Sequence, residues 1–185
     1  MTILLAAERP ERVGGHDAAW ALLRLAAARL GLAALPEIAR APGEKPRFAG
    51  RDDLFFSLSH TRTHVLCALA DRDVGADVET RRAVPDRLRD RLFTTQEQRD
   101  FDFFEGWTLR EAVYKLTGEG SLMHLRIMRS PLGVLTPFPG VRCRSYDDIP
   151  GCAAALATRD AELPARIELV PPAAILSCYS PGHIV

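Results

Sequence analysis

Two acidic residues near the middle of the chain have the type and spacing of a metal-binding pair. Asp77 and Glu79 stand two residues apart in the stretch VGADVE at 74–79, where apolar and acidic residues alternate. Successive side chains of a strand point to opposite faces, so both carboxylates would share one face while the apolar residues meet a core. Like charges side by side need water, a cation or basic partners. The pair is therefore either a strand end in solvent or half of a cation site.

Glu111 and Lys115 form a second candidate pair. They lie four residues apart in a segment with helical character, which places both on one helix face. An ordinary surface ion pair is the alternative interpretation. If this helix met the strand of Asp77 and Glu79, three carboxylates and a lysine would suit Mg²⁺ and a phosphate, because magnesium prefers oxygen ligands and lysine is a compact charge. The sequence alone does not show that the two elements meet.

Ser59 and His60 lie in a predicted turn between two strands. A turn backbone can hold an anion and an imidazole can donate to a phosphate. A turn histidine without a role is the alternative. A serine hydrolase fits less well, because the residues around Ser59 lack the nucleophile-elbow spacing.

Periodicity and turn residues predict the elements that must position these side chains. One helix is expected over 17–31 and another over 107–117, following an interruption at Gly106. Thr94 can cap a short helix between them, with Glu97 completing a capping box.

The strand pattern completes the expected fold. Segments 54–58, 64–70 and 74–79 predict an antiparallel meander. Later candidate strands are 122–128, 141–144, 153–157, 167–170 and 175–178. The order of helix, strands, helices and strands indicates an α+β fold.

Composition limits the classes of function. The 185 residues fit one domain or two small fused halves, and the formal net charge of zero gives no sign of nucleic-acid or membrane binding. No segment approaches the roughly 20 apolar residues of a membrane helix. The four cysteines lack the spacing of a metal site, so a reduced, cytoplasmic protein is expected. Of the 24 basic residues only Lys45 and Lys115 are lysines.

Four motifs occur together and in a recognisable order. They are FSLSHT at 56–61, VGADVE at 74–79, LFTTQE at 92–97 and WTLREAVYKLTGEG at 107–120. With this set the chain resembles the surfactin-type 4′-phosphopantetheinyl transferases, most specifically over 43–120. Ser57 departs from the asparagine that is usual in the family.

The resemblance implies a fold of two similar α/β halves, 1–95 and 96–185, in one compact unit with coenzyme A in the cleft between them. It also implies a holo-[acyl-carrier-protein] synthase activity. Such an enzyme transfers the 4′-phosphopantetheine arm of coenzyme A to a serine of an apo acyl or peptidyl carrier protein. It depends on Mg²⁺ and releases adenosine 3′,5′-bisphosphate, and a monomer is expected.

Residue roles follow from motif position. The resemblance assigns Asp77, Glu79 and Glu111 to the metal, and Glu111 and Lys115 to catalysis. The serine proton would go either to Glu111 or to a metal-bound water that Glu111 orients. Positions that match cofactor contacts are Arg24, Lys45, Pro46, Ser59, His60 and Lys115. The roles of four further residues stay open: Arg9, Arg12, His16 and Glu97.

Two alternatives come from other classes of function. A non-catalytic relative would keep the fold and bind coenzyme A or a carrier protein without transfer. A nucleotide-diphosphate hydrolase with the same carboxylates would break down coenzyme A without a carrier. The sequence does not indicate which carrier protein or pathway is served.

Overall fold

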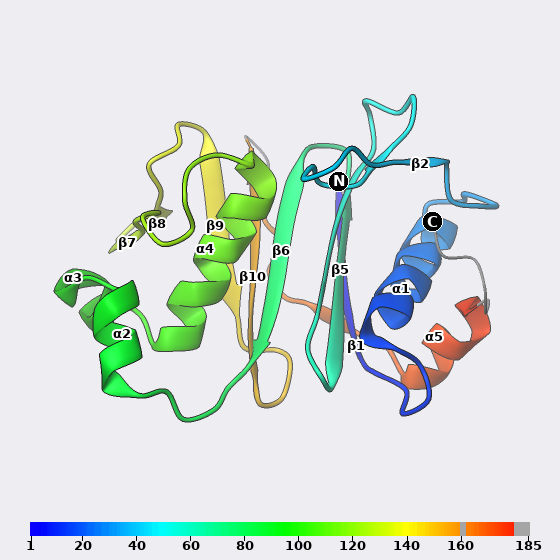
Figure 1. Ribbon diagram of the computed structural model, residues 1–185. Helices are drawn as coiled ribbons and strands as arrows, with labels where there is room; N and C mark the ends of the chain where they lie inside the picture. The colour runs from blue at the N-terminus through cyan, green and yellow to red at the C-terminus, as the bar shows by residue number, and fades with distance from the viewer. Residues whose placement is uncertain (160–161, 180–185) are drawn as a thin grey trace.

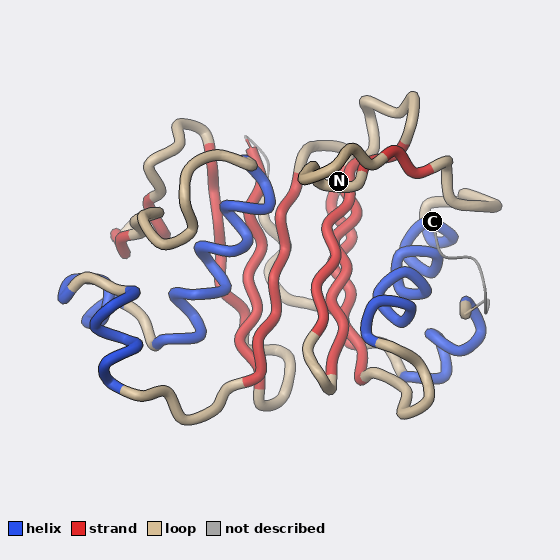
Figure 2. Tube along the Cα trace, viewed as in Figure 1, coloured by secondary structure: helices blue, strands red, loops and turns tan. Residues whose placement is uncertain are grey.

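The computed structural model describes residues 1–159 and 162–179, and it has four layers (Figure 1). Two β-sheets pack face to face, and helices cover the outer face of each (Figure 2). The strand order is β11-β1-β5-β4 in the first sheet and β6-β10-β9 in the second. Helices and strands are thus both present, as the predicted mixed architecture requires.

The elements of the two main sheets come from distant parts of the chain. The first sheet contains β1 (Thr2–Glu8), β4 (Phe55–His60), β5 (His64–Ala70) and β11 (Glu168–Leu169). The second contains β6 (Val74–Thr80), β9 (Val141–Tyr146) and β10 (Cys152–Arg159). Two small hairpins pair β2 (Ile38–Ala39) with β3 (Arg47–Phe48), and β7 (Met128–Ser130) with β8 (Gly133–Leu135).

The helices divide between the two outer faces. The first sheet is covered by α1 (Gly15–Arg29) and α5 (Pro172–Cys178), and the second by α4 (Phe103–Thr117) (Figure 1). The short helices α2 (Asp86–Leu92) and α3 (Thr95–Asp100) precede α4. None of the helices within the described ranges is both long and apolar enough to cross a bilayer.

Alternation along the central strands explains the layering. In β5, Val65 and Cys67 pack into the core beneath α1, whereas Leu66 and Ala68 pack into the core between the sheets. A strand covered on both faces needs apolar residues at every position, which accounts for the continuous run in β5.

The two sheets meet where β4 lies beside β6, and side chains replace a backbone ladder there. We call this contact the serine seam: the Ala76 N–H donates to Ser57 Oγ at 2.9 Å, and the Val78 N–H donates to Ser59 Oγ at 3.3 Å. The predicted three-strand meander is wrong for its last strand. Strands β4 and β5 pair with each other as predicted, but β6 pairs with β10 and not with β5. The turn after β5 carries the chain from one sheet to the other.

Four further expectations about elements need correction. Ser59 and His60 are the last two residues of strand β4 and do not belong to the turn that follows it. Residues 175–178 belong to helix α5 and not to a strand, and a proline in the first turn suits the start of that helix. The candidate strand 122–128 is mostly turn and loop, since β7 begins only at Met128. Gly106 lies inside α4 and does not interrupt it; an added Cβ there would approach the Phe93 ring to 2.8 Å.

The boundary predicted at residue 95 does not coincide with the division between the sheets. Strand β6 precedes it but pairs with the later strand β10, and β11 follows it but pairs with β1. Two similar halves with a cofactor cleft between them stay a prediction.

Candidate active site

A very close approach of β6 to helix α4 brings the charged residues together. A Cβ added to Gly75 would lie 2.0 Å from the carbonyl oxygen of Ala112 and 2.6 Å from the amide nitrogen of Leu116. Only a residue without a side chain permits the helix backbone to rest on the strand in this way. The helix is consequently near enough for Lys115 to reach the strand.

Local sequence fixes the ends of helix α4 and therefore the positions of its charged residues. Asp102 caps the helix and accepts hydrogen bonds from the amides of Phe104 and Glu105 at 2.9 and 3.1 Å. Gly118 ends it with a left-handed φ of 65°. Within it, Glu111 and Lys115 share one face because they are four residues apart.

Lys115 binds β6 through its ammonium group. Nζ donates to Oδ1 of Asp77 at 2.7 Å and to the carbonyl oxygen of Ala76 at 3.2 Å. The predicted meeting of the two pairs is therefore present for Lys115 and Asp77.

Asp77 is the most buried carboxylate of the group, with 5% of its surface exposed. Its Oδ1 also accepts a hydrogen bond from Ser59 Oγ at 2.8 Å. Its Oδ2 is buried and has no hydrogen-bond partner among residues 1–159 and 162–179. An unpartnered charged oxygen is costly in a protein interior, which fits a cation at this position.

The carboxylates of Glu79 and Glu111 are near enough to Asp77 to interact with its charge. Burial and the neighbouring Asp77 carboxylate raise the pKa of Glu79, and the same two causes raise the pKa of Glu111. Glu79 also lies 3.7 Å from the guanidinium of Arg82. Carboxylates that repel one another in this way favour the approach of a cation.

The three carboxylates do not form a finished metal site. Within the described part of the chain, no group of three or more His, Cys, Asp or Glu side chains is arranged to hold a metal ion. The unpartnered Oδ2 of Asp77 and the raised pKa values of Glu79 and Glu111 nevertheless fit a divalent cation. Their assignment as metal ligands stays a prediction.

A cavity of about 430 Å³ opens beside this cluster, with Lys115 as a shared wall. It lies between the start of α1, the loop that joins β2 and β3, β4 and the end of α4. Four residues predicted to contact a cofactor line it: Lys45, Pro46, His60 and Lys115. The structure thus brings these four residues to one cavity, and their contacts with a cofactor stay a prediction.

Two other predicted contacts do not line this cavity. Arg24 lies on α1 but is not among the lining residues, and Ser59 lies beneath the surface in the serine seam. His60 reaches the cavity because Gly15 leaves room for it: a Cβ at Gly15 would lie 2.7 Å from the imidazole Nδ1.

Lys45 binds the start of β6 and the residue that precedes it. Its Nζ donates to Asp73 Oδ1 at 2.9 Å and to the carbonyl oxygen of Val74 at 2.5 Å. Burial lowers the pKa of Lys45, with the Asp73 carboxylate opposing that change. Lys45 and Lys115, the two lysines of the chain, thus both bond to carbonyl oxygens of β6 on the side of the cavity.

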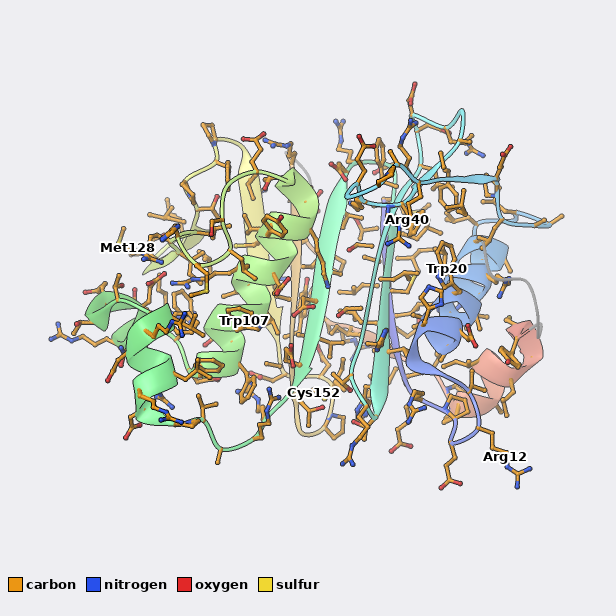
Figure 3. All side chains as sticks on the ribbon, in the orientation of Figure 1. Arg12, Trp20, Arg40, Trp107, Met128 and Cys152 are labelled. Atoms are coloured by element: carbon orange, nitrogen blue, oxygen red, sulfur yellow. The ribbon has the colours of Figure 1, made fainter. Side chains whose placement is uncertain are left out.

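Several lining residues were not predicted from the sequence. Trp20 and Arg40 line the cavity and lie together near α1 (Figure 3), and Tyr114 lines it from α4. His16 also lines the cavity, and its Nε2 accepts a hydrogen bond from the Trp20 indole N–H at 3.0 Å. Trp20 falls in the apolar stripe of a helix, so its pattern indicates core packing and not a cavity.

The remaining residues with open roles have structural contacts or are exposed. Arg9 donates to the carbonyl oxygens of Val13 and Arg62 and so braces the loop before α1. Arg12 is exposed and projects from that loop (Figure 3).

Glu97 has a clear structural role. The predicted capping box with Thr94 is confirmed, and Glu97 Oε1 also accepts from Arg110 Nη2 at 2.5 Å and from the Ile127 amide at 3.1 Å. Arg110 is fully buried and lies over the Phe93 ring. This network joins α3 to α4 and to the segment that follows α4.

Comparison with known proteins relates the same region to one family. Residues 73–138, which include Asp77, Glu79, Glu111 and Lys115, match the model of the 4′-phosphopantetheinyl transferase superfamily.

Three curated relatives illustrate the extent of the similarity. The chain is 33% identical over 75 residues to 4′-phosphopantetheinyl transferase psf-1 of Bacillus pumilus, covering 35% of this chain and 32% of that protein. It is 28% identical over 136 residues to AcpT of Escherichia coli K12, covering 58% and 70%. It is 37% identical over 87 residues to HetI of Nostoc sp. PCC 7120, covering 40% and 36%.

The match to psf-1 spans about a third of that relative's length, and the match to gsp of Aneurinibacillus migulanus has a similar extent. Over residues 73–138, which contain the charged cluster of the candidate site, the chain is similar to the 4′-phosphopantetheinyl transferase superfamily.

Proposed function

We propose that this chain is a 4′-phosphopantetheinyl transferase that acts on apo carrier proteins. The observation that carries the proposal is the Lys115–Asp77 contact beside the cavity, which lies in the segment that matches the superfamily model. The relatives named above are themselves described as 4′-phosphopantetheinyl transferases.

In the proposed reaction the hydroxyl oxygen of a carrier serine attacks the phosphorus that bears the pantetheine arm. A new phosphorus–oxygen bond forms, and the bond from that phosphorus to the bridging oxygen of the pyrophosphate breaks. Adenosine 3′,5′-bisphosphate leaves with the bridging oxygen, and the serine proton is released. Such transfers depend mainly on positioning and on charge neutralisation.

The cavity residues suit coenzyme A. Lys45 and His60 offer donors to its phosphates, and the aromatic side chains of Trp20 and Phe56 offer apolar surface to the adenine. Lys115 would shift from Asp77 towards the pyrophosphate and stabilise the charge that develops in transfer.

Mg²⁺ fits the cluster as the implied cation. Asp77, Glu79 and Glu111 would hold it, and when bound it supplies charge neutralisation for the pyrophosphate. We assign Glu111 to the serine proton, which it would receive directly or through a water that it orients.

We further propose that the protein is a monomer and that it acts in the cytoplasm. The four cysteines are free thiols, as expected for a protein of a reducing compartment. Light scattering of the purified chain tests the monomer.

Intact-mass spectrometry of the carrier tests the activity. The chain is incubated with coenzyme A, Mg²⁺ and either an apo acyl or an apo peptidyl carrier protein. We expect one carrier to gain the mass of a single phosphopantetheine group. A carrier whose serine is replaced by alanine is the control and should gain nothing.

Two results would reject the proposal. Coenzyme A that binds without any mass gain on either carrier would favour a non-catalytic protein. Coenzyme A that is cleaved without a carrier would favour a hydrolase.

A further inference from the structure

The Ser59 hydroxyl holds Asp77 and β6 at the same time. Ser59 Oγ accepts a hydrogen bond from the Val78 N–H at 3.3 Å and donates to Asp77 Oδ1 at 2.8 Å. Ser59 and Asp77 are both buried, at 8% and 5% exposure. Water therefore does not readily replace either partner.

A hydroxyl has a single proton to donate, and in Ser59 that proton goes to Asp77. Ser59 could donate to a cofactor phosphate only by releasing the carboxylate. It also does not line the cavity, whereas the neighbouring His60 does. These observations argue against a direct cofactor contact for Ser59.

The two donors to Asp77 converge on one oxygen. Ser59 Oγ and Lys115 Nζ both bond to Oδ1, at 2.8 and 2.7 Å, and Oδ2 is left without a hydrogen-bond partner in the described structure. If Lys115 turns towards a phosphate, Ser59 is the side chain that still fixes the orientation of the carboxylate.

We propose that Ser59 is a positioning residue, which orients Asp77 so that Oδ2 is presented to a divalent cation. The inference rests on the proposed function for the identity of the ligand. Hydrogen-bonded partners of metal-ligating groups commonly change metal affinity by about 10- to 100-fold when they are removed.

Ser57 provides a matched control. It is buried on the same face of β4 and accepts the equivalent hydrogen bond, from the Ala76 N–H at 2.9 Å. Unlike Ser59, it has no hydrogen bond to Asp77 in the described part of the chain, and it lines the cavity. Ser57→Ala and Ser59→Ala therefore remove the same kind of bond in the serine seam, and only Ser59→Ala removes the bond to Asp77.

The experiment measures Mn²⁺ binding by calorimetry for the wild-type chain and both variants, each saturated with coenzyme A. We expect Ser59→Ala to weaken Mn²⁺ binding about tenfold or more. Ser57→Ala should change it by less than about threefold, although both variants lose a hydrogen bond of the serine seam and should have lower melting temperatures than the wild type. No carrier protein is involved, so the result is independent of whether the chain transfers a phosphopantetheine group.

A second titration separates positioning from direct cofactor binding. Coenzyme A is titrated without any divalent metal, and we expect Ser59→Ala to bind it as tightly as wild type. Loss of this metal-free binding, equal Mn²⁺ affinities for the two alanine variants, or no Mn²⁺ binding by the wild type would each overturn the inference. Ser59→Cys, which keeps the shape but donates weakly, should show an intermediate loss of Mn²⁺ affinity and serves if Ser59→Ala does not fold.

Discussion

The Lys115 ammonium lies 2.7 Å from Oδ1 of the buried Asp77 carboxylate, while Oδ2 has no partner within residues 1–159 and 162–179. The lysine therefore neutralises the carboxylate without using all of its ligand capacity. A site of this kind can exchange one cationic partner for another when a phosphate and a metal arrive together.

Lys115 tests the electrostatic part of the account. Lys115→Met keeps much of the side-chain length but removes the charge, and we expect the rate of transfer to fall about 100- to 1000-fold, as when one donor to a developing charge is deleted. Lys115→Arg should restore only part of the rate, because a planar guanidinium does not reproduce a compact ammonium. Steady-state transfer rates at saturating coenzyme A measure both. A rate for Lys115→Met within about threefold of wild type would remove Lys115 from the reaction.

The two tryptophans allow cofactor binding to be located. Trp20 lines the cavity, whereas Trp107 lies on α4 on the other side of the sheets (Figure 3) and stacks on Phe103. We expect coenzyme A to change the fluorescence of the wild-type chain and of Trp107→Phe, but not that of Trp20→Phe. The opposite pattern would place the cofactor elsewhere.

Gly75 tests how α4 is brought to β6. Gly75→Ala would place a Cβ 2.0 Å from the Ala112 carbonyl oxygen, so the helix must move. We expect a loss of about 3 kcal/mol in the free energy of unfolding, the upper range for overpacking, measured by urea denaturation. Gly14→Ala is the control, because its Cβ would meet only an ordinary contact at 3.7 Å. Equal stabilities of the two variants would contradict the close approach.

The buried Glu97–Arg110 pair predicts a dependence of stability on pH. Burial would raise the pKa of Glu97, but the hydrogen bonds from Arg110, Thr94 and Ile127 outweigh burial and lower it below the ordinary value of 4.5. Glu97 therefore takes up a proton more readily in the unfolded chain than in the folded chain. The stability that the charged Glu97 contributes is present above pH 4.5 and is lost as the pH falls below it.

Glu97→Gln tests this dependence by urea denaturation at pH 7 and at pH 3.5. At pH 7 we expect a loss of about 3 kcal/mol, because the buried Arg110 loses its charged partner. The difference between wild type and variant should shrink at the lower pH. A difference that is constant with pH would show that the charge of Glu97 does not contribute.

The residue types of the site could be predicted from the sequence, but their distances could not. The four-residue spacing puts Glu111 and Lys115 on one helix face, and the alternation in β6 puts Asp77 and Glu79 on one strand face. The close approach of this helix to this strand depends on Gly75. The sequence does not show that need for glycine, because the helix backbone that packs on Gly75 comes from a distant part of the chain. Only the resemblance to a family indicated from the sequence that the helix and the strand would meet.

Other features could not be predicted from the sequence, because they depend on residues that are distant along the chain. Periodicity predicts β6 as a strand but does not identify β10 as its neighbour. Trp20 looks like a core residue in its helix, yet it faces a cavity whose opposite wall is formed by other segments. Ser59 matches a cofactor-binding motif, and its hydrogen bond to Asp77 became visible only with the serine seam.

The most direct test of the central claim compares wild type with Asp77→Asn in the carrier mass assay. Asparagine keeps the shape of the side chain but removes the charge that pairs with Lys115 and would hold the cation. We expect the wild type to add one phosphopantetheine group to the carrier serine in the presence of Mg²⁺. We expect Asp77→Asn to add none in the same time while unfolding at a similar temperature. Transfer by Asp77→Asn at a rate close to wild type would contradict it.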